Sequence, residues 1–135
     1  MERPTLAVGL MSGTSLDGVD AALVRLTGPT QCELLHFLTR PYGPAERDLL
    51  LAAIGQGNAR DLARLHVRLA EWSVEAVEAL LAEAHVRASD LGLIAMHGQT
   101  IWHEPPAVSW QLGEPAVLAE RFGVRVVSNF RARDV

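Results

Sequence analysis

A long amphipathic segment, residues 58 to 85, constrains the fold of this 135-residue chain more than any other feature. Its apolar side chains recur at steps of three and four residues, which is the period of a helix with one buried face. Asn58 can cap the first turn, because a side-chain oxygen at that position accepts a hydrogen bond from a free backbone N–H group. The apolar face consists of Leu62, Leu65, Leu69, Trp72, Ala76 and Leu80. The sequence therefore predicts one helix that reaches about His85.

Short apolar runs on both sides of this helix predict β-strands. Residues 5 to 11, 19 to 26 and 32 to 39 come before the helix and predict a three-stranded meander. Residues 91 to 96 come after it, so a strand, a long helix and another strand follow one another. That order requires a crossover connection, which pairs two strands in parallel. The sequence therefore predicts an α/β domain with a mixed sheet and flanking helices.

The rest of the chain predicts two short helices and two brief strands, which proline and glycine residues separate. The helices span about 44 to 54 and 114 to 123, and the strands span 109 to 112 and 125 to 128. The sequence has no internal repeat, low-complexity tract or linker. Residues 1 to 135 are therefore predicted to form a single domain.

The charge pattern argues against several kinds of partner. The chain has 12 basic and 16 acidic residues and a formal net charge of −4, and its basic residues are all arginine. They are spread along the sequence, whereas nucleic acid binding requires a basic patch, so we expect no nucleic acid partner. The missing lysine also excludes a Walker loop, which places that side chain on the β and γ phosphates of a nucleotide.

The apolar content predicts a protein that does not associate with membranes. No apolar run of the sequence approaches the roughly 20 residues that a membrane-spanning helix requires. The first residues also lack the pattern of a secretory signal. The single cysteine, Cys32, excludes an intramolecular disulfide and is expected as a small buried side chain on a strand. We therefore expect a cytoplasmic protein.

A glycine-rich segment, residues 9 to 20, follows the first predicted strand and reads Gly-Leu-Met-Ser-Gly-Thr-Ser-Leu-Asp-Gly-Val-Asp. Its glycines permit positive φ angles and a close approach of backbone to ligand, while Thr14 and Ser15 offer hydroxyl donors, as a phosphate group requires. Asp17 and Asp20 could hold a metal ion that the phosphates share, because hard cations prefer oxygen ligands. The same residues would also suit a tight hairpin whose composition serves turn geometry alone.

Two further polar clusters follow predicted strands. Residues 97 to 100 (His-Gly-Gln-Thr) come directly after the strand at 91 to 96, and residues 129 to 134 come after the last strand. Ligands of open α/β sheets gather at the carboxyl ends of the strands. The first cluster offers donors and acceptors that suit sugar hydroxyls, while Arg131 and Arg133 suit a carboxylate or a phosphate. A structural histidine and a frayed basic C-terminus are the respective alternatives.

Two other kinds of site are weaker interpretations. His97 and His103 could bind zinc, but their spacing matches no common ligand pattern and no cysteine pair accompanies them. A hydrolase nucleophile at Ser15 would need a glycine two residues later on a strand-to-helix elbow, and Asp17 occupies that position. The sequence therefore favours phosphate and sugar binding over either of these sites.

Four motifs occur in order along the chain. They are the glycine-rich segment, His-Gly-Gln-Thr-Ile-Trp-His-Glu-Pro at 97 to 105, Gln-Leu-Gly-Glu-Pro at 111 to 115, and Phe-Arg-Ala-Arg-Asp at 130 to 134. In residues, order and spacing they closely resemble the anhydro-N-acetylmuramic acid kinase family, and the resemblance spans the whole chain. It implies a fold, a reaction and a set of site residues.

The resemblance implies the actin-like sugar-kinase fold of hexokinase and Hsp70, in which a β-hairpin grips the ATP phosphates. The missing lysine agrees with that fold. The implied residues for ATP phosphates are Gly13, Thr14, Ser15, Leu16, Asp17, Gly18, Val19 and Asp20, with Asp17 and Asp20 also on Mg²⁺. The residues implied to face the amino sugar and its lactyl carboxylate are His97, Gly98, Gln99, Thr100 and Arg131.

The implied reaction transfers phosphate from ATP to the 6-oxygen of 1,6-anhydro-N-acetylmuramic acid while water opens the anhydro bridge. The product, N-acetylmuramic acid 6-phosphate, belongs to peptidoglycan recycling. Positioning, charge neutralisation by Mg²⁺ and a carboxylate base for the water would supply the catalysis. The base is expected beyond residue 135. Family members carry aspartate where this chain has Asn129.

Family chains are well over twice as long as this one, so the resemblance implies an incomplete N-terminal lobe without its second lobe. Kinases of this fold close two lobes over their substrates, so the chain alone is expected to be inactive. A homodimer is implied for the full-length protein. Two alternatives stay open: a non-catalytic module that binds nucleotide or sugar, and a small serine hydrolase.

Overall fold

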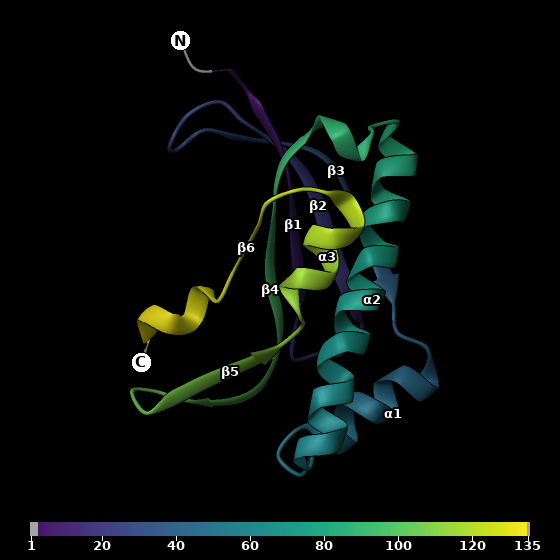
Figure 1. Ribbon diagram of the computed structural model, residues 1–135, viewed down its shortest axis with the longest axis vertical. Coiled ribbons are helices and arrows are strands. Elements are labelled where there is room, and N and C mark those ends of the chain that lie inside the picture. The colour runs from purple at the N-terminus through teal and green to yellow at the C-terminus, as the bar shows by residue number, and fades with distance from the viewer. Residues whose placement is uncertain (1–2, 135) are drawn as a thin grey trace.

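The computed structural model describes residues 3 to 134 and consists of a mixed β-sheet with one long helix and two shorter ones beside it (Figure 1). The strands are β1 (Thr5–Ser12), β2 (Gly18–Leu26), β3 (Cys32–Pro41), β4 (Leu91–Glu104), β5 (Val108–Leu112) and β6 (Val126–Ser128). The helices are α1 (Pro44–Ala53), α2 (Ala59–Ala84) and α3 (Pro115–Phe122), with short 3-10 helices η1 (Ala88–Asp90) and η2 (Phe130–Asp134). The sequence prediction of a mixed sheet with flanking helices is confirmed.

The strand order of the sheet is β3-β2-β1-β4-β5, and β6 pairs with the first half of β4. β1, β2 and β3 form the predicted antiparallel meander. β4 runs parallel to β1, with Leu10 opposite Met96, which confirms the crossover predicted from the position of α2. Because β6 is also parallel to β4, the carboxyl ends of β1, β4 and β6 point toward the same edge of the sheet.

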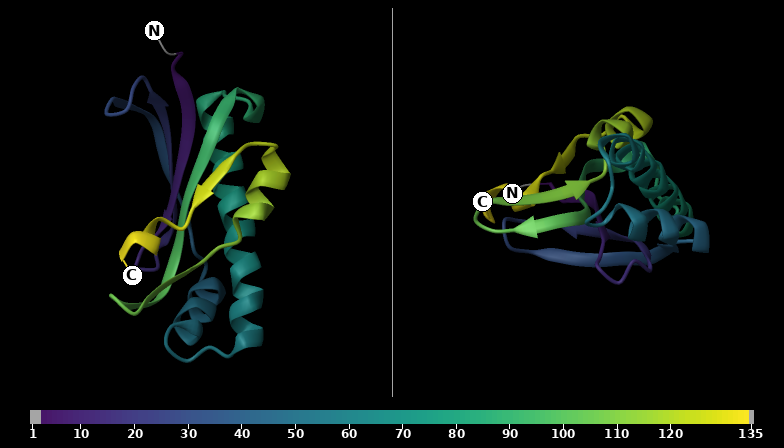
Figure 2. Two further views of the ribbon diagram at one scale, coloured as in Figure 1. Left: turned by 60° about the vertical axis from the view of Figure 1, so that its left-hand side comes forward. Right: turned by 90° about the horizontal axis from the view of Figure 1, so that it is seen from below.

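Helix α2 packs against β2 and β3, and α3 packs against α2 and β6 (Figure 2). The predicted apolar face of α2 is largely buried, with Leu69 at 2% exposed and Trp72 at 3%. Asn58 Oδ1 accepts a hydrogen bond from the Asp61 N–H group at 2.9 Å, which confirms the predicted cap. Within residues 3 to 134, no helix combines the length and the apolar character that crossing a membrane needs.

Strand β4 is longer than predicted. The sequence predicts a strand over residues 91 to 96, whereas β4 continues to Glu104 because its second half forms a hairpin with β5. Gly98 has a φ of +80°, and a Cβ atom there would clash with the backbone oxygen of Leu112. Residues 97 to 100 therefore lie at an irregular point inside a strand, not in a turn that follows one.

Cys32 is exposed, which corrects the expectation of a buried side chain. It lies at the first position of β3, and residues 31 to 34 around it are all exposed. The β2–β3 hairpin extends there away from the helices (Figure 1), so no second layer covers it. The strand itself was predicted correctly. The sequence did not predict that its first residues would lie outside the core.

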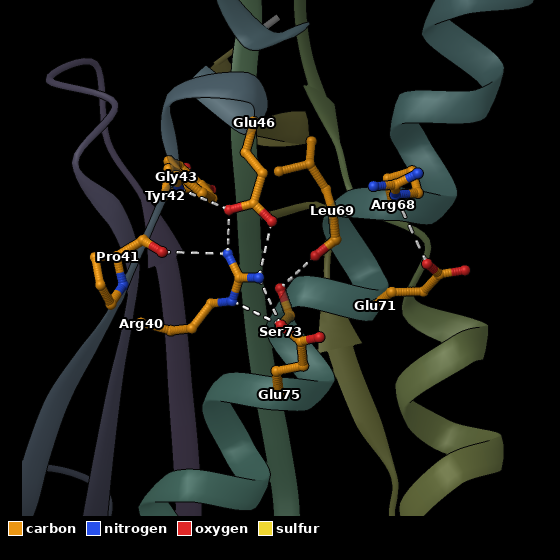
Figure 3. A network of polar contacts seen from close by, with 11 residues as sticks. Arg40, Pro41, Tyr42, Gly43, Glu46, Arg68, Leu69, Glu71, Ser73 and Glu75 are labelled. Carbon is orange, nitrogen blue, oxygen red and sulfur yellow. Dashed lines mark hydrogen bonds and ion pairs between the residues drawn. The ribbon is translucent and has the colours of Figure 1, made fainter. Parts of the chain in front are cut away.

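A network of ion pairs ties the end of β3 to α1 and α2 (Figure 3). The Arg40 guanidinium donates to the Glu46 carboxylate at 2.7 and 2.9 Å and to the Glu75 carboxylate at 2.7 Å. It also lies 5.7 Å from the ring centre of Trp72. The hydrogen bonds between Arg40 and Glu46 raise the pKa of Arg40 and lower the pKa of the Glu46 carboxyl. The network fixes the connection from β3 to α1 in one position.

Glu46→Gln is expected to cost about 1 to 2 kcal/mol of stability at neutral pH. Glutamine loses the ion pair with Arg40 but can still accept the hydrogen bond that the Gly43 N–H group donates to Glu46 at 2.9 Å. Because the folded-state pKa lies below the ordinary value of 4.5, the stabilisation is present above that pH and is lost as the pH falls through the folded-state pKa. Urea unfolding near pH 7 and near pH 3 should therefore show a difference between wild type and variant that shrinks in acid.

The matched control for this variant is Glu71→Gln. Glu71 forms an exposed pair with Arg68 at 3.9 Å, and such pairs contribute little to stability. We expect no measurable change at either pH. Equal destabilisation by both glutamine variants, or a Glu46→Gln effect that does not depend on pH, would contradict the stabilising role of the Arg40 network.

Candidate functional site

One face of the sheet carries a hollow of about 370 Å³ over β1, β2 and β4. Met11, Phe37 and Phe130 give it apolar walls, and each of these side chains is about half exposed. The polar side chains in its lining are Asp20 of β2 and His97 of β4. The structure therefore brings a carboxylate of the glycine-rich segment together with the histidine of the 97 to 100 cluster, which are far apart in sequence.

The tip of the glycine-rich segment, Gly13 to Ser15, is its most accessible part. Thr14 and Ser15 are exposed and Gly13 is half-buried, so backbone N–H groups and hydroxyls are presented to solvent. These are the groups that the sequence predicts for phosphate binding. Within the described residues, no hydrogen bond pairs Ser15 with a histidine, so the structure offers no base to activate it as a hydrolase nucleophile.

Other residues of this segment are buried and pack against the rest of the protein. The Leu16 side chain is 3% exposed and its N–H group donates to the Gly13 carbonyl at 3.2 Å, so the side chain and the N–H group are both engaged within the protein. The positive φ of the segment falls at Leu16, at 55°, and not at a glycine as expected. Gly18 is required for a different reason, because a Cβ atom there would lie 2.8 Å from Pro41 Cα. Val19 is buried at 2% and can contact a ligand only through its backbone.

The two aspartates of the segment differ in their surroundings. Asp20 Oδ1 accepts a hydrogen bond from Thr39 Oγ1 at 2.6 Å beside the hollow. Asp17 is 75% exposed, with Arg47 at 4.0 Å. Across residues 3 to 134, no group of three or more His, Cys, Asp or Glu side chains could form a cage around a metal. Mg²⁺ usually takes one or two carboxylates and completes its shell with phosphates and water. Binding of Mg²⁺ by Asp17 and Asp20 stays a prediction from the family resemblance.

His97 and Arg131 lie together, as the sequence predicts for two parts of one site. The Arg131 Nε–H group donates to His97 Nε2 at 3.3 Å, so His97 Nδ1 carries the proton and donates to the Gly98 carbonyl at 3.1 Å. Arg131 also donates to Asp134 Oδ2 at 3.1 Å. These contacts lie in η2, so the C-terminal segment is folded against β4 and the alternative of a frayed basic end is wrong.

The polar side chains of Gln99 and Thr100 have hydrogen-bond partners within the protein. Gln99 is fully buried; its Oε1 accepts from Ser12 Oγ, and its Nε2 donates to the Thr100 carbonyl at 3.1 Å. Thr100 Oγ1 accepts from Gln111 Nε2 at 3.1 Å. The structure thus places only the His97 side chain of this cluster at the hollow. The contacts of Gly98, Gln99 and Thr100 with a sugar stay predictions from the family resemblance.

Two other sequence observations have structural counterparts. Asn129 has a φ of 65°, a conformation that Asn and Asp adopt more readily than most residues, so either would suit this backbone. His103 Nδ1 bonds Ser109 Oγ at 2.8 Å, while His97 is engaged with Arg131, so the two histidines of the weak zinc hypothesis have different partners. The structure gives that hypothesis no support.

Ser12 and Tyr42 were not singled out from the sequence, yet they hold the glycine-rich segment. Tyr42 Oη and Ser12 Oγ are 2.6 Å apart, and the two residues are separated by 30 positions. A lone tyrosine after a strand carries no local signal of such a contact. Only the antiparallel pairing of β2 with β3 reveals it, because that pairing places Pro41 opposite Gly18.

Comparison with known proteins identifies the family. The sequence profile of anhydro-N-acetylmuramic acid kinase matches residues 5 to 135. The chain belongs to this family. A relative from Salinibacter ruber that bears the same name is 45% identical over 95% of the chain. Others from Rhizorhabdus wittichii and Xanthomonas campestris are each 41% identical, over 96% and 100% of the chain.

These kinase relatives are much longer than the chain. It covers 36% of the Salinibacter ruber protein, 38% of the Rhizorhabdus wittichii protein and 39% of the Xanthomonas campestris protein. Among solved structures, YeaZ from Pseudomonas aeruginosa is similar to 93% of the chain and 43% of its own length, at 17% identity and a TM-score of 0.35. That likeness is too weak to carry an argument, so the kinase family assignment rests on sequence.

Proposed function

We propose that the protein containing this chain is a kinase that phosphorylates 1,6-anhydro-N-acetylmuramic acid with ATP, in the recycling of cell-wall peptidoglycan. The family match over residues 5 to 135 carries this proposal. The hollow that joins Asp20 to His97 supports it, because it places a residue implied for ATP beside one implied for the sugar. The actin-like fold of sugar kinases is part of the same proposal.

The tip of the glycine-rich segment is proposed to bind the ATP phosphates. Its exposed backbone N–H groups and the hydroxyls of Thr14 and Ser15 are donors, and phosphate oxygens are acceptors. The chain has no lysine that could contact these oxygens. A cradle of backbone amides is proposed to hold them instead. Asp17 and Asp20 would hold Mg²⁺, which neutralises charge on the phosphates when it is bound.

His97 and Arg131 are proposed to bind the sugar. Arg131 presents a planar guanidinium on η2, and such a group can capture the lactyl carboxylate in two parallel hydrogen bonds. Its hydrogen bond to the Asp134 carboxylate supports this proposal, because that guanidinium already binds one carboxylate oxygen. His97 keeps an Nε2 lone pair toward Arg131, so it orients the guanidinium at the edge of the hollow.

The proposed reaction joins ring opening to phosphoryl transfer. Water adds to C1 of the sugar and loses a proton to a base, the bond from C1 to O6 breaks, and O6 attacks the γ-phosphorus of ATP as the bond from that phosphorus to the bridging oxygen of ADP breaks. The products are N-acetylmuramic acid 6-phosphate and ADP. Positioning and charge neutralisation supply most of the rate in phosphoryl transfer, which suits a site built from amides and arginine. The base is not assigned to a residue of this chain.

The test measures ADP formation by the purified product of the intact gene, in a coupled assay with 1,6-anhydro-N-acetylmuramic acid, N-acetylmuramic acid, N-acetylglucosamine or glucose. We expect ADP formation that requires the anhydro sugar. Binding of ATP or sugar without ADP formation would favour the non-catalytic module. Covalent labelling of Ser15 by a fluorophosphonate, with no kinase activity, would favour the serine hydrolase.

A further inference from the structure

Tyr42 contacts the glycine-rich segment on both sides of its exposed tip. Tyr42 follows β3, and its phenol oxygen lies 2.6 Å from Ser12 Oγ at the end of β1. Its backbone N–H group donates to the Asp17 carbonyl at 2.9 Å, just before β2 begins. The exposed tip, Gly13 to Ser15, lies between these two contacts. Tyr42 therefore spans the base of the loop that the proposed function assigns to phosphate.

The direction of the hydrogen bonds around Ser12 is set by one fixed acceptor. The Thr100 carbonyl can only accept, so the Gln99 amide must turn its Nε2 toward that carbonyl and its Oε1 toward Ser12. Ser12 Oγ–H then donates to Gln99, and its lone pair accepts from the Tyr42 hydroxyl. Burial raises the pKa of Tyr42, which keeps the phenol protonated as a donor.

This chain of bonds gives Ser12 an internal role. Its only proton is directed to Gln99, and its side chain is 4% exposed, so it cannot donate to a phosphate as Thr14 and Ser15 can. Gln99 lies two residues from His97 on β4. The same chain of bonds thus links the loop proposed for ATP phosphate to the strand that carries a residue proposed for the sugar.

Tyr42 is itself held by the core. Its ring lies 5.4 Å from the ring of Trp72, which is buried on α2 at 3% exposed. The Arg40–Glu46 ion pair flanks it (Figure 3), and the Glu46 carboxylate accepts from the N–H group of the next residue, Gly43. Because Tyr42 contacts both the helices and the loop, it couples the position of the loop to that of α1 and α2.

We propose that Tyr42 is a positioning residue for the phosphate-binding tip of the glycine-rich segment. It acts through Ser12 and the backbone of Asp17. The proposal rests on the proposed function, because it assumes that the tip binds ATP phosphate. It adds a residue outside the four motifs that relate the chain to the kinase family.

The deciding variant is Tyr42→Phe in the product of the intact gene, which removes the bond to Ser12 and keeps the ring against Trp72. The matched control is Ser73→Ala. Ser73 is 4% exposed, and its hydroxyl donates to the Leu69 carbonyl inside α2 at 2.8 Å. Each variant removes one hydroxyl hydrogen bond, which is part-buried for Tyr42 and buried for Ser73, so both should lower the unfolding midpoint by small amounts.

The kinetic readout separates positioning from stability. We expect Tyr42→Phe to raise the KM for MgATP by about fivefold or more and to leave the KM for the sugar within about twofold. Ser73→Ala should leave both constants unchanged. Equal kinetic effects of the two variants, or an unchanged KM for MgATP in Tyr42→Phe, would overturn the proposal.

Amide hydrogen exchange tests Tyr42 without reference to catalysis. Tyr42→Phe should speed exchange at the two hydrogen-bonded amides of the loop, those of Leu16 and Tyr42, by about tenfold, and Ser73→Ala should not. In a double-mutant cycle, Ser12→Ala and Tyr42→Phe should act non-additively on that exchange, because they break the same bond. Additive or absent effects would overturn the positioning role. Inactive wild-type protein with the expected exchange result would instead overturn the proposed function.

Discussion

Gly18→Ala is expected to destabilise the protein by about 3 kcal/mol and to abolish activity with it. The added Cβ atom would lie 2.8 Å from Pro41 Cα and 2.9 Å from the Arg40 carbonyl carbon, and it would clash with the Arg40 oxygen. These are backbone atoms of a paired strand, with Gly18 opposite Pro41, so no side chain can rotate away. The β2–β3 pairing must open where the glycine-rich segment enters the sheet.

The matched control for this variant is Gly28→Ala, beyond the other end of β2. A Cβ atom there meets nothing within 4 Å, and its φ is not positive. We expect its free energy of unfolding to stay within about 0.5 kcal/mol of wild type. Urea denaturation of both variants, followed by tryptophan fluorescence, measures the difference. Similar midpoints for the two alanine variants would contradict the packing of Gly18 against β3.

Arg131→Ala is expected to lower kcat/KM for 1,6-anhydro-N-acetylmuramic acid by about 100-fold. A charge-assisted hydrogen-bond pair contributes about 1.5 to 3 kcal/mol, which corresponds to about 10- to 100-fold or slightly more in rate. The loss should be specific to the lactyl carboxylate. For 1,6-anhydro-N-acetylglucosamine, which lacks that group, wild type and variant should therefore agree within about threefold.

Arg133→Ala is the control for Arg131→Ala. Both arginines belong to η2, but Arg133 is exposed, whereas Arg131 is half-buried and contacts His97, which lines the hollow. We expect its kcat/KM to match wild type for both sugars. A loss with Arg133→Ala as large as that with Arg131→Ala would indicate a general effect of positive charge. A loss with Arg131→Ala that is equal on both sugars would argue against carboxylate recognition.

Local periodicity accounts for the parts of the fold that were predicted. The 58 to 85 segment encodes α2 because its apolar spacing, its Asn58 cap and its length are all local signals. The parallel pairing of β1 with β4 then follows from topology, since a helix of that length separates the strands. The meeting of Arg131 with His97 also follows from pairing, because β6 lies beside Ile94 to Met96 of β4, so the chain after β6 emerges next to His97.

The features that were missed depend on surroundings that the local run of residues does not encode. β4 extends to Glu104 only because β5 folds back on it, and the 91 to 96 run contains no sign of that hairpin. The burial of Gln99 and its bond to Ser12 were not predicted, because Ser12 is 87 positions away, and its contact with a sugar stays a prediction. Cys32 looked like a core residue, but the β2–β3 hairpin runs past the helices there.

The most direct test of the kinase assignment is a single incubation of the gene product with ATP and 1,6-anhydro-N-acetylmuramic acid in ¹⁸O-labelled water, analysed by mass spectrometry. We expect N-acetylmuramic acid 6-phosphate that carries one ¹⁸O atom, because water opens the ring at C1, together with unlabelled ADP. Inorganic phosphate that carries the label, without any phosphorylated sugar, would show plain ATP hydrolysis and would contradict the assignment.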